Sequence, residues 1–578
     1  MNDRLHLDLH VDSHVDFQWG VKIVLRDGIH LNATLYLPRP ACAPSPCVFT
    51  MTPYIADGLH DRAVYFATHG VPFLIVDVRG RGNSEGEFRP AIQEAHDGYD
   101  VVEWIACQLY CNGKVAMWGS SYLGYSQWAT AKEFPPHLAS IVPTAAPYFG
   151  VDFPMRNNIF VPYVMQWLAL TAGRTSQGRI FGDSAFWSRI YRRWHESGRA
   201  FRDLDAMIGL PSRIFQQWLD HPELDEYWDT HNPIPAQYAR MELPILTITG
   251  SYDDDQPGAL EHYKQHMRYA TEVARTRHYL VIGPWDHWGA DVPRAEFGGI
   301  RVAPQSLIDM PKLQLQWYAW TMQEGPKPEF LEKRVAYYVM GAERWRYVDT
   351  LSEATSRHTT LFLDSLGEAN DVFASGCLQK VRGSGVPDSY VHDPRDTGGP
   401  EVAAEACIRA DSLVDQSVIL ALHGKLLVYH SDPFEADTEV TGFFKLAAWI
   451  AIDCPDADFY VSVHEVDLAG NSIRVTTDAM RARYREGSRA ARLIRTREPL
   501  LYEFEKFTFV SREVKRGHRL RLVIAPMGRL IETTFAQKNY HGGGCVSEES
   551  AAQGRPVTVR LYHDASHPSA LSVPLGRN

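Results

Sequence analysis

The sequence predicts an α/β domain that is interrupted by a helical insertion and followed by an all-β domain. Strand-like apolar runs alternate with helix-like patterns over residues 1–148 and again over 241–350, which is typical of a parallel α/β sheet. Residues 149–240 are rich in aromatic residues and arginine and contain no strand-like run. Over residues 351–578, short β-rich segments are separated by Gly, Asp and Pro, which indicates a sandwich or jelly roll.

The predicted elements follow one another in the order that this architecture needs. An Asp27-Gly28 turn joins the first two strands in a hairpin. Val71–Val78 is almost continuously apolar, as expected of a strand buried on both faces. Apolar residues recur along one stripe over Ala91–Leu109, which predicts a helix. The predicted strands are Val21–Leu25, Leu31–Leu37, Cys47–Met51, Val71–Val78, Val115–Trp118, Leu243–Thr249, Tyr279–Ile282, Phe443–Ile452, Phe459–Val466 and Arg519–Ala525.

Composition and charge exclude several classes of protein. The chain has 578 residues and a formal net charge of −12, and nucleic-acid-binding proteins usually carry a basic balance instead. Its longest apolar runs are strand-length, well short of the ~20 residues that span a bilayer. The N-terminus lacks an apolar signal core, and the eight cysteines are scattered without a CxxC motif. We therefore expect a cytoplasmic protein with reduced thiols that binds neither a membrane nor nucleic acid; a homo-oligomer remains open.

A glycine-flanked serine is the sharpest local signal for chemistry. Gly119-Ser-Ser-Tyr-Leu-Gly124 follows a predicted buried strand and opens a helical stretch over Ser126–Lys132. A strand–turn–helix elbow of this kind exposes a nucleophilic serine, and the third position of the motif is Ser121. Ser120 is the neighbouring alternative. The second glycine stands one place later than in the general G-x-S-x-G pattern.

Candidate partners for this serine follow the next two predicted strands. Asp253, in the triplet Asp253-Asp254-Asp255, comes just after Leu243–Thr249, and His287 comes just after Tyr279–Ile282. A serine nucleophile needs a histidine base and an acid that orients it, and in this fold class they occur in the chain order Ser, Asp, His. Both order and placement match this requirement.

Other clusters of polar residues have simpler explanations. His6, His10 and His14 alternate with aspartates, which predicts the polar face of an edge strand rather than a metal site. Cys107 and Cys111 are spaced as on one helix face, but two cysteines do not make a zinc site. His541-Gly-Gly-Gly544 imitates an oxyanion motif but is expected to be a loop. No P-loop or dinucleotide fingerprint is present, so we expect no cofactor and no metal.

Five motifs along the chain can be considered together. They are Thr52-Pro-Tyr54, Asp77-Val-Arg-Gly-Arg-Gly82 with Ser84-Glu-Gly86, Gly119-Ser-Ser-Tyr-Leu-Gly124, Gly250-Ser-Tyr-Asp253 and Gly283-Pro-Trp-Asp-His287. In combination they resemble the cocaine-esterase-like hydrolases, which are related to the α-amino-acid ester hydrolases, glutaryl acylases and X-Pro dipeptidyl peptidases. The resemblance spans nearly the whole chain and implies an α/β-hydrolase domain with an inserted helical cap and a C-terminal jelly roll.

The resemblance also implies a role for each matching residue. Ser121 is similar to the family's nucleophile, Asp253 to its acid and His287 to its base. A tyrosine hydroxyl replaces one backbone donor of the oxyanion hole in this family, and Tyr54 occupies the matching position. The second donor would be the backbone N–H of Tyr122, the residue after the nucleophile.

The substrate is less well determined. In the α-amino-acid ester hydrolases a carboxylate cluster holds the substrate ammonium. Here Asp255 is followed by Gln256, and the amides Asn157 and Asn158 follow Asp152 where a third carboxylate is expected, so the cluster is predicted to be incomplete. Aromatic residues suggest an apolar acyl site, although each could equally be a core residue. The candidate substrate-binding residues are Phe149, Phe153, Tyr252, Asp255, Trp285 and Trp288, with Phe160 and Trp167 as further aromatic candidates.

These observations predict a serine hydrolase that cleaves a small carboxylic ester. A peptidase or amidase of the same fold is an alternative, because the triad does not separate ester from amide cleavage. A non-catalytic protein that keeps the hydrolase shell is a third possibility. The presence of Ser121, Asp253, His287 and Tyr54 together argues against it.

Overall fold

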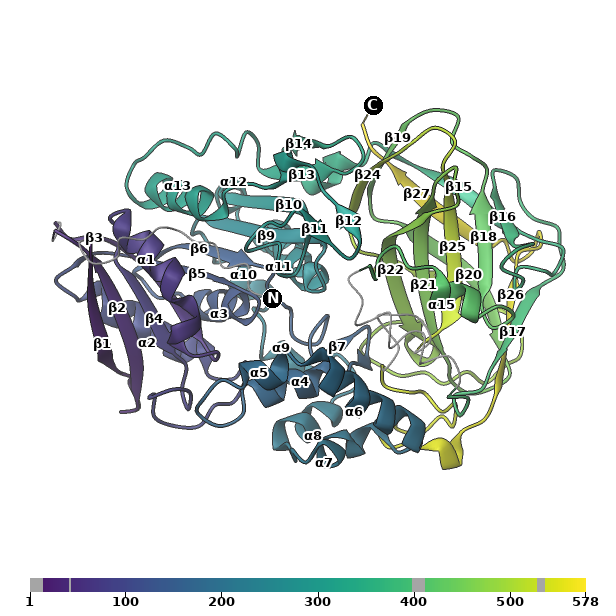
Figure 1. Ribbon diagram of the computed structural model, residues 1–578, viewed down its shortest axis with the longest axis horizontal. Coiled ribbons are helices and arrows are strands. Elements are labelled where there is room, and N and C mark those ends of the chain that lie inside the picture. The colour runs from purple at the N-terminus through teal and green to yellow at the C-terminus, as the bar shows by residue number, and fades with distance from the viewer. Residues whose placement is uncertain (1–13, 41–42, 398–410, 528–535, 578) are drawn as a thin grey trace.

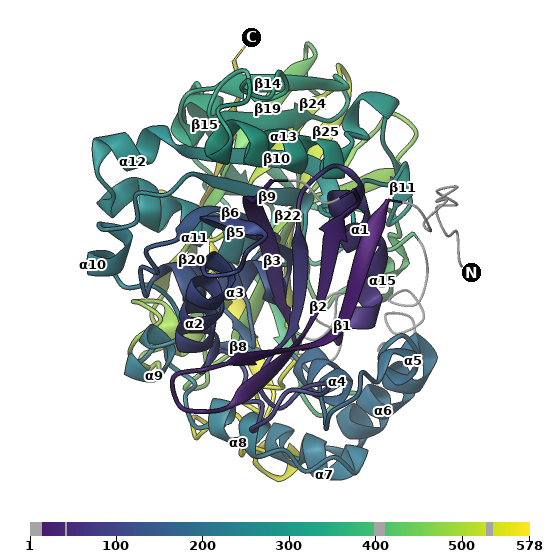
Figure 2. The same cartoon turned by 90° about the vertical axis from the view of Figure 1, so that its left-hand side faces the viewer.

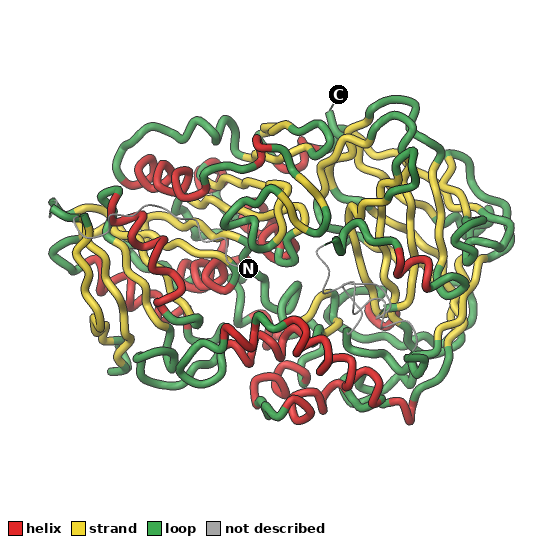
Figure 3. The backbone as a smooth tube through the Cα atoms, viewed as in Figure 1, coloured by secondary structure: helices red, strands yellow, loops and turns green. Residues whose placement is uncertain are grey.

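The protein is described by a computed structural model covering residues 14–40, 43–397, 411–527 and 536–577 (Figure 1). An N-terminal sheet with its helices and a C-terminal domain of strands lie side by side, and a helical segment lies against both (Figures 1 and 3). None of the helices in these ranges is long and apolar enough to cross a membrane.

The N-terminal sheet has ten strands, of which the seven central ones are parallel. Antiparallel strands extend it at both edges, and β1 and β2 lie at one of these edges (Figure 2). The predicted hairpin and the fully buried strand β4 are both confirmed. In spatial order the strands are β1 (Val15–Val24), β2 (His30–Pro38), β4 (Phe73–Asp77), β3 (Ser45–Thr52), β5 (Cys111–Ser120), β6 (Leu138–Thr144), β9 (Ile245–Tyr252), β10 (His278–Asp286), β13 (Val335–Val339) and β14 (Arg344–Val348).

Helices cover both faces of this sheet, as its buried strands require. Apolar side chains of α1 (His60–Thr68) and α13 (Met310–Met322) pack on one face, with Phe66 and Trp317 in the same cluster as Phe73. The other face is covered by α2 (Glu94–Ala106) and α3 (Tyr122–Ala131). Two further helices, α11 (Gln256–Tyr269) and α12 (Glu272–Thr276), lie between β9 and β10 in the chain.

The segment between β6 and β9 is mainly helical, as predicted, but it also contains a short hairpin. Two-residue strands β7 (Met155–Arg156) and β8 (Ile159–Phe160) flank Asn157 and Asn158, which both have positive φ. The aromatic residues of this segment form its core. Its helices are α4 (Tyr163–Leu170), α5 (Gly178–Phe181), α6 (Ser184–Ser197), α7 (Leu204–Ile208), α8 (Arg213–Leu219), α9 (Glu226–Asp229) and α10 (Pro235–Tyr238).

The C-terminal domain is built mostly from strands, joined in one thirteen-stranded sheet (Figure 3). A five-residue helix, α15 (Ser417–Ala421), and the short hairpin β11 (Glu296–Phe297)–β12 (Ile300–Arg301) complete the elements. The strands are β15 (Arg357–Asp364), β16 (Gly376–Gln379), β17 (Asp388–His392), β18 (Leu427–Ser431), β19 (Thr438–Gly442), β20 (Lys445–Ile452), β21 (Asp458–Val466), β22 (Ser472–Arg481), β23 (Leu500–Phe504), β24 (Val510–Val514), β25 (Arg519–Pro526), β26 (Val557–Tyr562) and β27 (Ala570–Leu575).

Two of the polar clusters from the sequence need comment. Cys107 and Cys111 do not share a helix, because α2 ends at Ala106 and Cys111 already begins β5. The prediction of a common helix face was therefore wrong. His6 and His10 lie outside the described residues; β1, which starts at Val15, is an edge strand of the sheet.

Three histidines are buried together, two on α11 (His262 and His266) and one at the start of β10 (His278). His278 and His266 face each other with 3.0 Å between their Nδ1 atoms, and His278 Nε2 lies 2.8 Å from Thr247 Oγ1. His262 stacks on Trp128 with 4.7 Å between ring centroids. Burial lowers the pKa of His262 to about 3 and that of His266 to about 4, and it lowers the pKa of His278 as well.

We expect this cluster to make the fold sensitive to acid. A histidine in the unfolded chain has a pKa of ~6.5. Below that pH the unfolded chain therefore binds protons, whereas the buried rings of the folded protein stay neutral. The stabilisation is present above pH ~6.5 and is lost as pH falls towards about 4, by about 1.4 kcal/mol per pH unit for each histidine. The Tm measured between pH 7.5 and 5 should fall less steeply in His266→Gln than in the wild type. The exposed His96→Gln should keep the wild-type slope; an equal slope in all three proteins would contradict the prediction.

Candidate active site

Ser121 lies on a strained turn between β5 and α3. Its φ of 62° and ψ of −127° fall outside the regions that residues other than glycine usually adopt. The turn is held because the Ser121 N–H donates to Thr144 O at 2.9 Å. Such strain is typical of a functional position, since it persists only where the surrounding structure enforces it.

The glycines of this elbow are required by close packing. A Cβ on Gly119 would lie 2.3 Å from Leu123 Cβ, and a Cβ on Gly124 would lie 2.6 Å from Thr144 O. The second contact brings the first turn of α3 against the end of β6. Gly124 stands one residue later than the second glycine of the general G-x-S-x-G pattern because this is where α3 contacts the end of β6.

Asp253 and His287 meet at the ends of two neighbouring parallel strands, β9 and β10. His287 Nδ1 lies 2.8 Å from Asp253 Oδ1, and Thr249 Oγ1 donates to Asp253 Oδ2 at 2.9 Å. The Asp253 side chain is fully buried. A carboxylate at Nδ1 favours the tautomer with its proton on that nitrogen, which leaves Nε2 as the basic atom.

Tyr54 follows β3 and points its hydroxyl to the same place. Trp167 Nε1, from α4, donates to the Tyr54 oxygen at 2.9 Å, and the nearby Ser121 side chain acts to lower the pKa of Tyr54. Burial raises the pKa of Tyr54 to about 12, so the hydroxyl keeps its proton at neutral pH. Because Trp167 occupies an acceptor site of the oxygen, the O–H remains available for donation.

Tyr122 is the first residue of α3, so its N–H belongs to the first turn, which has no intrahelical acceptor. Its side chain is buried, and the hydroxyl donates to the Glu94 carboxylate and accepts from the Ala91 N–H at 2.8 Å. These bonds fix the residue that follows Ser121.

A cavity of about 610 Å³ opens beside these groups. Both Ser121 and His287 line it, and its walls come from the helical segment and from strands β21 and β22 as well as from the N-terminal sheet. Most lining side chains are apolar or aromatic, and the charged ones are mainly aspartates. Its lining residues include Asp152, Phe153, Arg156, Trp167, Asp254, Asp255, Trp288 and Asp478.

Comparison with known proteins agrees with this arrangement. Residues 27–289 match the X-Pro dipeptidyl-peptidase (S15 family) model, and residues 329–528 match that of the X-Pro dipeptidyl-peptidase C-terminal non-catalytic domain. Cocaine esterase from Rhodococcus sp. (strain MB1 Bresler) is 25% identical over 601 residues, a match that spans 98% of this chain and 99% of that protein. The chain is a serine hydrolase that is similar to cocaine esterase over nearly its whole length.

Solved structures show the same hydrolase fold. An α-amino acid ester hydrolase superposes with a TM-score of 0.81 at 20% identity, covering 97% of both chains. An aminopeptidase from the marine sediment archaeon Thaumarchaeota archaeon superposes with a TM-score of 0.82 at 20% identity, covering 100% of this chain and 98% of its own. Two units therefore make up this fold, an N-terminal hydrolase domain and a C-terminal domain of mostly strands.

The structure divides the candidate substrate-binding residues into two groups. Asp255, Phe153 and Trp288 line the cavity, and Trp288 is 65% exposed there. Three others are not among the lining residues. Phe149 packs against Tyr125 in the core. Trp285 donates from Nε1 to Ser306 O, and the Tyr252 hydroxyl donates to Arg474 O.

The amide side chains at the positions where a carboxylate was expected form hydrogen bonds with the C-terminal domain. Asn157 Nδ2 donates to Asp478 Oδ1 at 3.0 Å, and Asn158 Nδ2 donates to Ser488 O at 2.9 Å. Gln256 is fully buried and exchanges hydrogen bonds with the backbone of Phe509. All three amides therefore connect to the C-terminal domain.

Asp152 is a second carboxyl group that lines the cavity beside Asp255. Its carboxyl accepts hydrogen bonds from the N–H groups of Tyr148 and Gly258. Burial first, and then the nearby Asp255, hold the pKa of Asp152 well above its usual range. Burial likewise raises the pKa of Asp255, to about 7. Two neighbouring carboxyl groups in a low-dielectric site do not ionise together readily.

The acidic triplet controls the basicity of His287. Burial lowers its pKa, but the carboxylates of Asp253, Asp255 and Asp254 outweigh this effect and raise the pKa to about 10. Asp255 Oδ2 lies 3.7 Å from His287 Nδ1. Since a general base must be neutral, activity should rise with pH to an apparent pKa above the unperturbed value of ~6.5.

We expect Asp255→Asn to move this acid limb to lower pH. Removing a negative charge beside the imidazolium destabilises the charged form, so the apparent pKa in kcat/KM should fall by about one unit. The pH profile of ester hydrolysis by both proteins measures the shift. Asp286→Asn is the matched control, because Asp286 pairs with Arg294 instead. An acid limb that stays in place or moves upward in Asp255→Asn would contradict the assignment.

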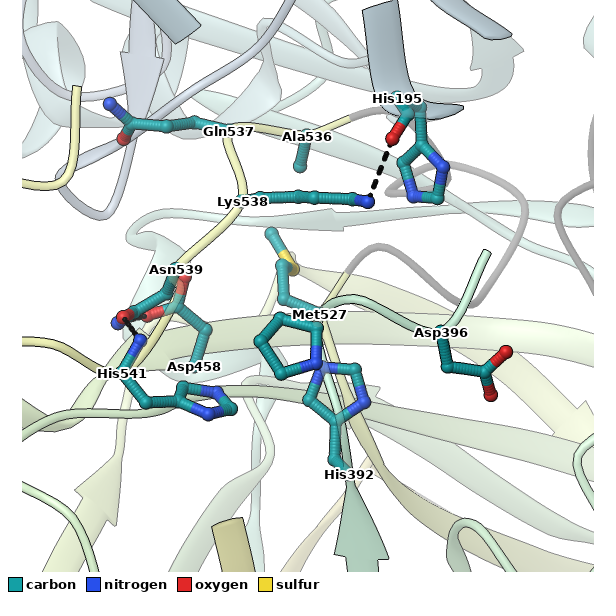
Figure 4. Close-up of a pocket in the computed structure, with 11 residues that line it drawn as sticks. His195, His392, Asp396, Asp458, Met527, Ala536, Gln537, Lys538, Asn539 and His541 are labelled. Atoms are coloured by element: carbon teal, nitrogen blue, oxygen red, sulfur yellow. Dashed lines mark hydrogen bonds between the residues drawn. The ribbon is translucent and has the colours of Figure 1, made fainter. Parts of the chain in front are cut away.

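A second, much smaller hollow lies between α6 and the C-terminal strands (Figure 4). His195, His392 and His541 line it, and Lys538 Nζ donates to His195 O at 3.0 Å. Its volume of about 20 Å³ holds one water molecule. Within the described ranges no group of three or more His, Cys, Asp and Glu is arranged to hold a metal ion. Residues 541–544 form a loop, as predicted.

Proposed function

We propose that this protein is an ester hydrolase that works through an acyl-enzyme on Ser121. His287 would be the general base, Asp253 the acid that orients it, and the Tyr54 hydroxyl and Tyr122 N–H the oxyanion donors. The observation that carries this proposal is the 2.8 Å contact between His287 Nδ1 and Asp253 Oδ1 beside a cavity that Ser121 also lines.

The proposed reaction has two halves, acylation and deacylation, and His287 carries the proton in both. His287 Nε2 takes the proton of Ser121 Oγ as the oxygen attacks the ester carbonyl, and the tetrahedral oxyanion receives hydrogen bonds from Tyr54 and Tyr122. The oxyanion collapses, the C–O bond to the alcohol breaks, and the His287 imidazolium returns the proton to the departing alkoxide. Water, deprotonated by His287, then attacks the acyl-enzyme and releases the carboxylic acid and free Ser121.

In this proposal the helical segment 149–240 is a cap and residues 351–578 form a jelly roll. Residues 1–148 and 241–350 together form the hydrolase domain. The lining of the cavity supports this division, because Trp167 of α4 and Asp478 of β22 both contribute to it. Acyl and alcohol groups would thus be enclosed between three parts of the chain.

We infer further that the substrate is an ester of an amine-bearing small molecule. Among the described residues, Asp152, Asp254, Asp255 and Asp478 line the cavity together with one arginine, Arg156. Burial raises the pKa of each of these carboxyl groups, and a cationic ammonium beside the ester would favour their ionised form, so their excess suits an amine-bearing substrate. The names of two relatives, cocaine esterase and α-amino acid ester hydrolase, point to such esters.

Amide cleavage is the second candidate, because one match is a dipeptidyl-peptidase family and one structural relative is an aminopeptidase. A panel of p-nitrophenyl esters, with and without an α-amine, should be compared with Ala-Pro and glutaryl p-nitroanilides. We expect hydrolysis of esters with preference for the amine-bearing ones, and none by Ser121→Ala. Turnover of the anilides alone would favour the peptidase or amidase. No turnover of any substrate by the wild type would contradict the ester proposal.

A further inference from the structure

The turn that carries Tyr54 is strained at the next residue. Ile55 has a φ of 72° and a ψ of 139°, a conformation that is rare for a β-branched side chain. Backbone of this kind persists only where neighbouring groups hold it. The direction of the Tyr54 side chain therefore depends on what binds the chain on either side of Ile55.

Arg81 binds the chain on the N-terminal side of this turn. Its Nε donates to Pro53 O at 2.7 Å, and its side chain is fully buried. The other two guanidinium nitrogens donate to carbonyls at and beyond the end of α4, those of Leu170, Gly173 and Thr175. A cation is favourable at the C-terminal end of a helix, and only a planar guanidinium can serve so many carbonyls at once.

Asp77 holds the other side of Ile55. Its Oδ1 accepts from the Ala56 N–H at 3.0 Å, and it attracts the Arg81 charge. A Cβ on Gly82 would lie 2.3 Å from Asp77 Oδ2, so the glycine of this motif leaves room for the carboxylate. Asp77 and Arg81 thus act on backbone groups that flank Tyr54 and Ile55.

Arg81 also links Tyr54 to its hydrogen-bonding partner. Trp167 lies on α4, whose last residue, Leu170, accepts from Arg81 Nη2 at 3.5 Å, and Trp167 Nε1 donates to the Tyr54 hydroxyl. One guanidinium therefore binds the segment that carries the hydroxyl and the segment that carries its donor. Loss of this connection would let the two segments move independently.

We propose that Arg81 is a positioning residue that holds the Tyr54 hydroxyl against Ser121, with Asp77 completing the clamp around Ile55. This inference rests on the proposed role of Tyr54 in the oxyanion hole. It assigns to the Asp77–Gly82 motif a function in catalysis that acts through Tyr54, without contact between Arg81 and the substrate.

A double-mutant cycle tests whether Arg81 acts through Tyr54. Arg81→Lys keeps the charge but loses the planar set of donors. We expect kcat to fall about 10- to 100-fold with KM changed less than twofold, as for a small displacement of a catalytic group. In a Tyr54→Phe background, where there is no hydroxyl to position, Arg81→Lys should change kcat less than twofold.

The control is Arg79→Lys. Arg79 belongs to the same motif, but it pairs with Asp97 and Asp27, so its variant should keep wild-type kcat. Circular dichroism and Tm establish that the variants fold. Should Arg81→Lys fail to fold, Asp77→Asn tests the clamp from the Ala56 side, with the same expected dependence on Tyr54.

The possible outcomes separate the two proposals. Near-wild-type kcat in Arg81→Lys, or an equal loss with and without the Tyr54 hydroxyl, would overturn the positioning role and leave the oxyanion proposal standing. If Tyr54→Phe alone keeps full kcat, the oxyanion proposal itself fails. If Arg81→Lys raises KM but leaves kcat unchanged, Arg81 affects only the shape of the cavity, and its proposed action through Tyr54 is overturned.

Discussion

Ser121→Ala is expected to lower kcat for ester hydrolysis by about 10⁶-fold, the size of loss seen when a serine nucleophile is removed from a triad. In the proposed mechanism Ser121 supplies the oxygen of the acyl-enzyme, so residual turnover would come from water attacking a substrate bound in the cavity. The fold should be unaffected, because the strained φ of Ser121 is held by its backbone bond to Thr144 O. Initial rates with a p-nitrophenyl ester measure the effect.

Ser120→Ala is the matched control for this experiment. Ser120 is the last residue of β5, next to the turn, and its variant should keep kcat within a few-fold of the wild type. A serine-directed organophosphonate should add its mass to the wild type and to Ser120→Ala but leave Ser121→Ala unlabelled. Labelling that disappears only in Ser120→Ala would place the nucleophile one residue earlier.

Tyr54→Phe should lower kcat by about 10²–10³-fold while KM stays nearly unchanged, as when one oxyanion donor is removed. The hydroxyl interacts with an oxygen that carries full charge only in the transition state, so its loss should not weaken substrate binding. The ring and its packing remain in the variant. Steady-state kinetics on an activated ester separate kcat from KM.

Tyr337→Phe controls for the loss of a buried tyrosine hydroxyl as such. Tyr337 lies in β13, within an apolar cluster, and its variant should keep wild-type kcat. Retention of full activity by Tyr54→Phe, or a rise in KM alone, would exclude the hydroxyl from the oxyanion hole. Backbone N–H groups would then have to supply both donors.

The sequence alone predicted most strands of the N-terminal sheet and the proximity of Asp253 and His287, but not β6, β13 and β14. Buried parallel strands appear as apolar runs, so Val71–Val78 and Val115–Trp118 could be identified without a structure. The carboxyl ends of parallel strands meet at one edge of a sheet. Asp253 and His287, each just beyond a predicted strand, were therefore expected to be neighbours, and they are 2.8 Å apart.

Only the tertiary structure decided which aromatic and polar residues face the cavity. Phe149 and Phe153 are four residues apart in one apolar segment, yet Phe153 lines the cavity and Phe149 does not. The local sequence shows that a side chain is apolar, but it does not show whether that side chain packs against protein or faces a cavity. Asn157 and Gln256 likewise received their roles from segments of the C-terminal domain, to which they hydrogen-bond across more than 250 residues of chain.

The contacts of Tyr54 could not be predicted from the sequence either. Trp167 is 113 residues away along the chain, and the carbonyls that Arg81 binds belong to two different segments. A motif such as Asp77–Gly82 shows which donors and acceptors are present, whereas their partners are fixed by the packing of the helical segment on the sheet. Motifs and their order therefore predicted the candidate reacting groups, and tertiary contacts alone determined what holds those groups in position. Such contacts join parts of the chain whose local sequences carry no information about each other.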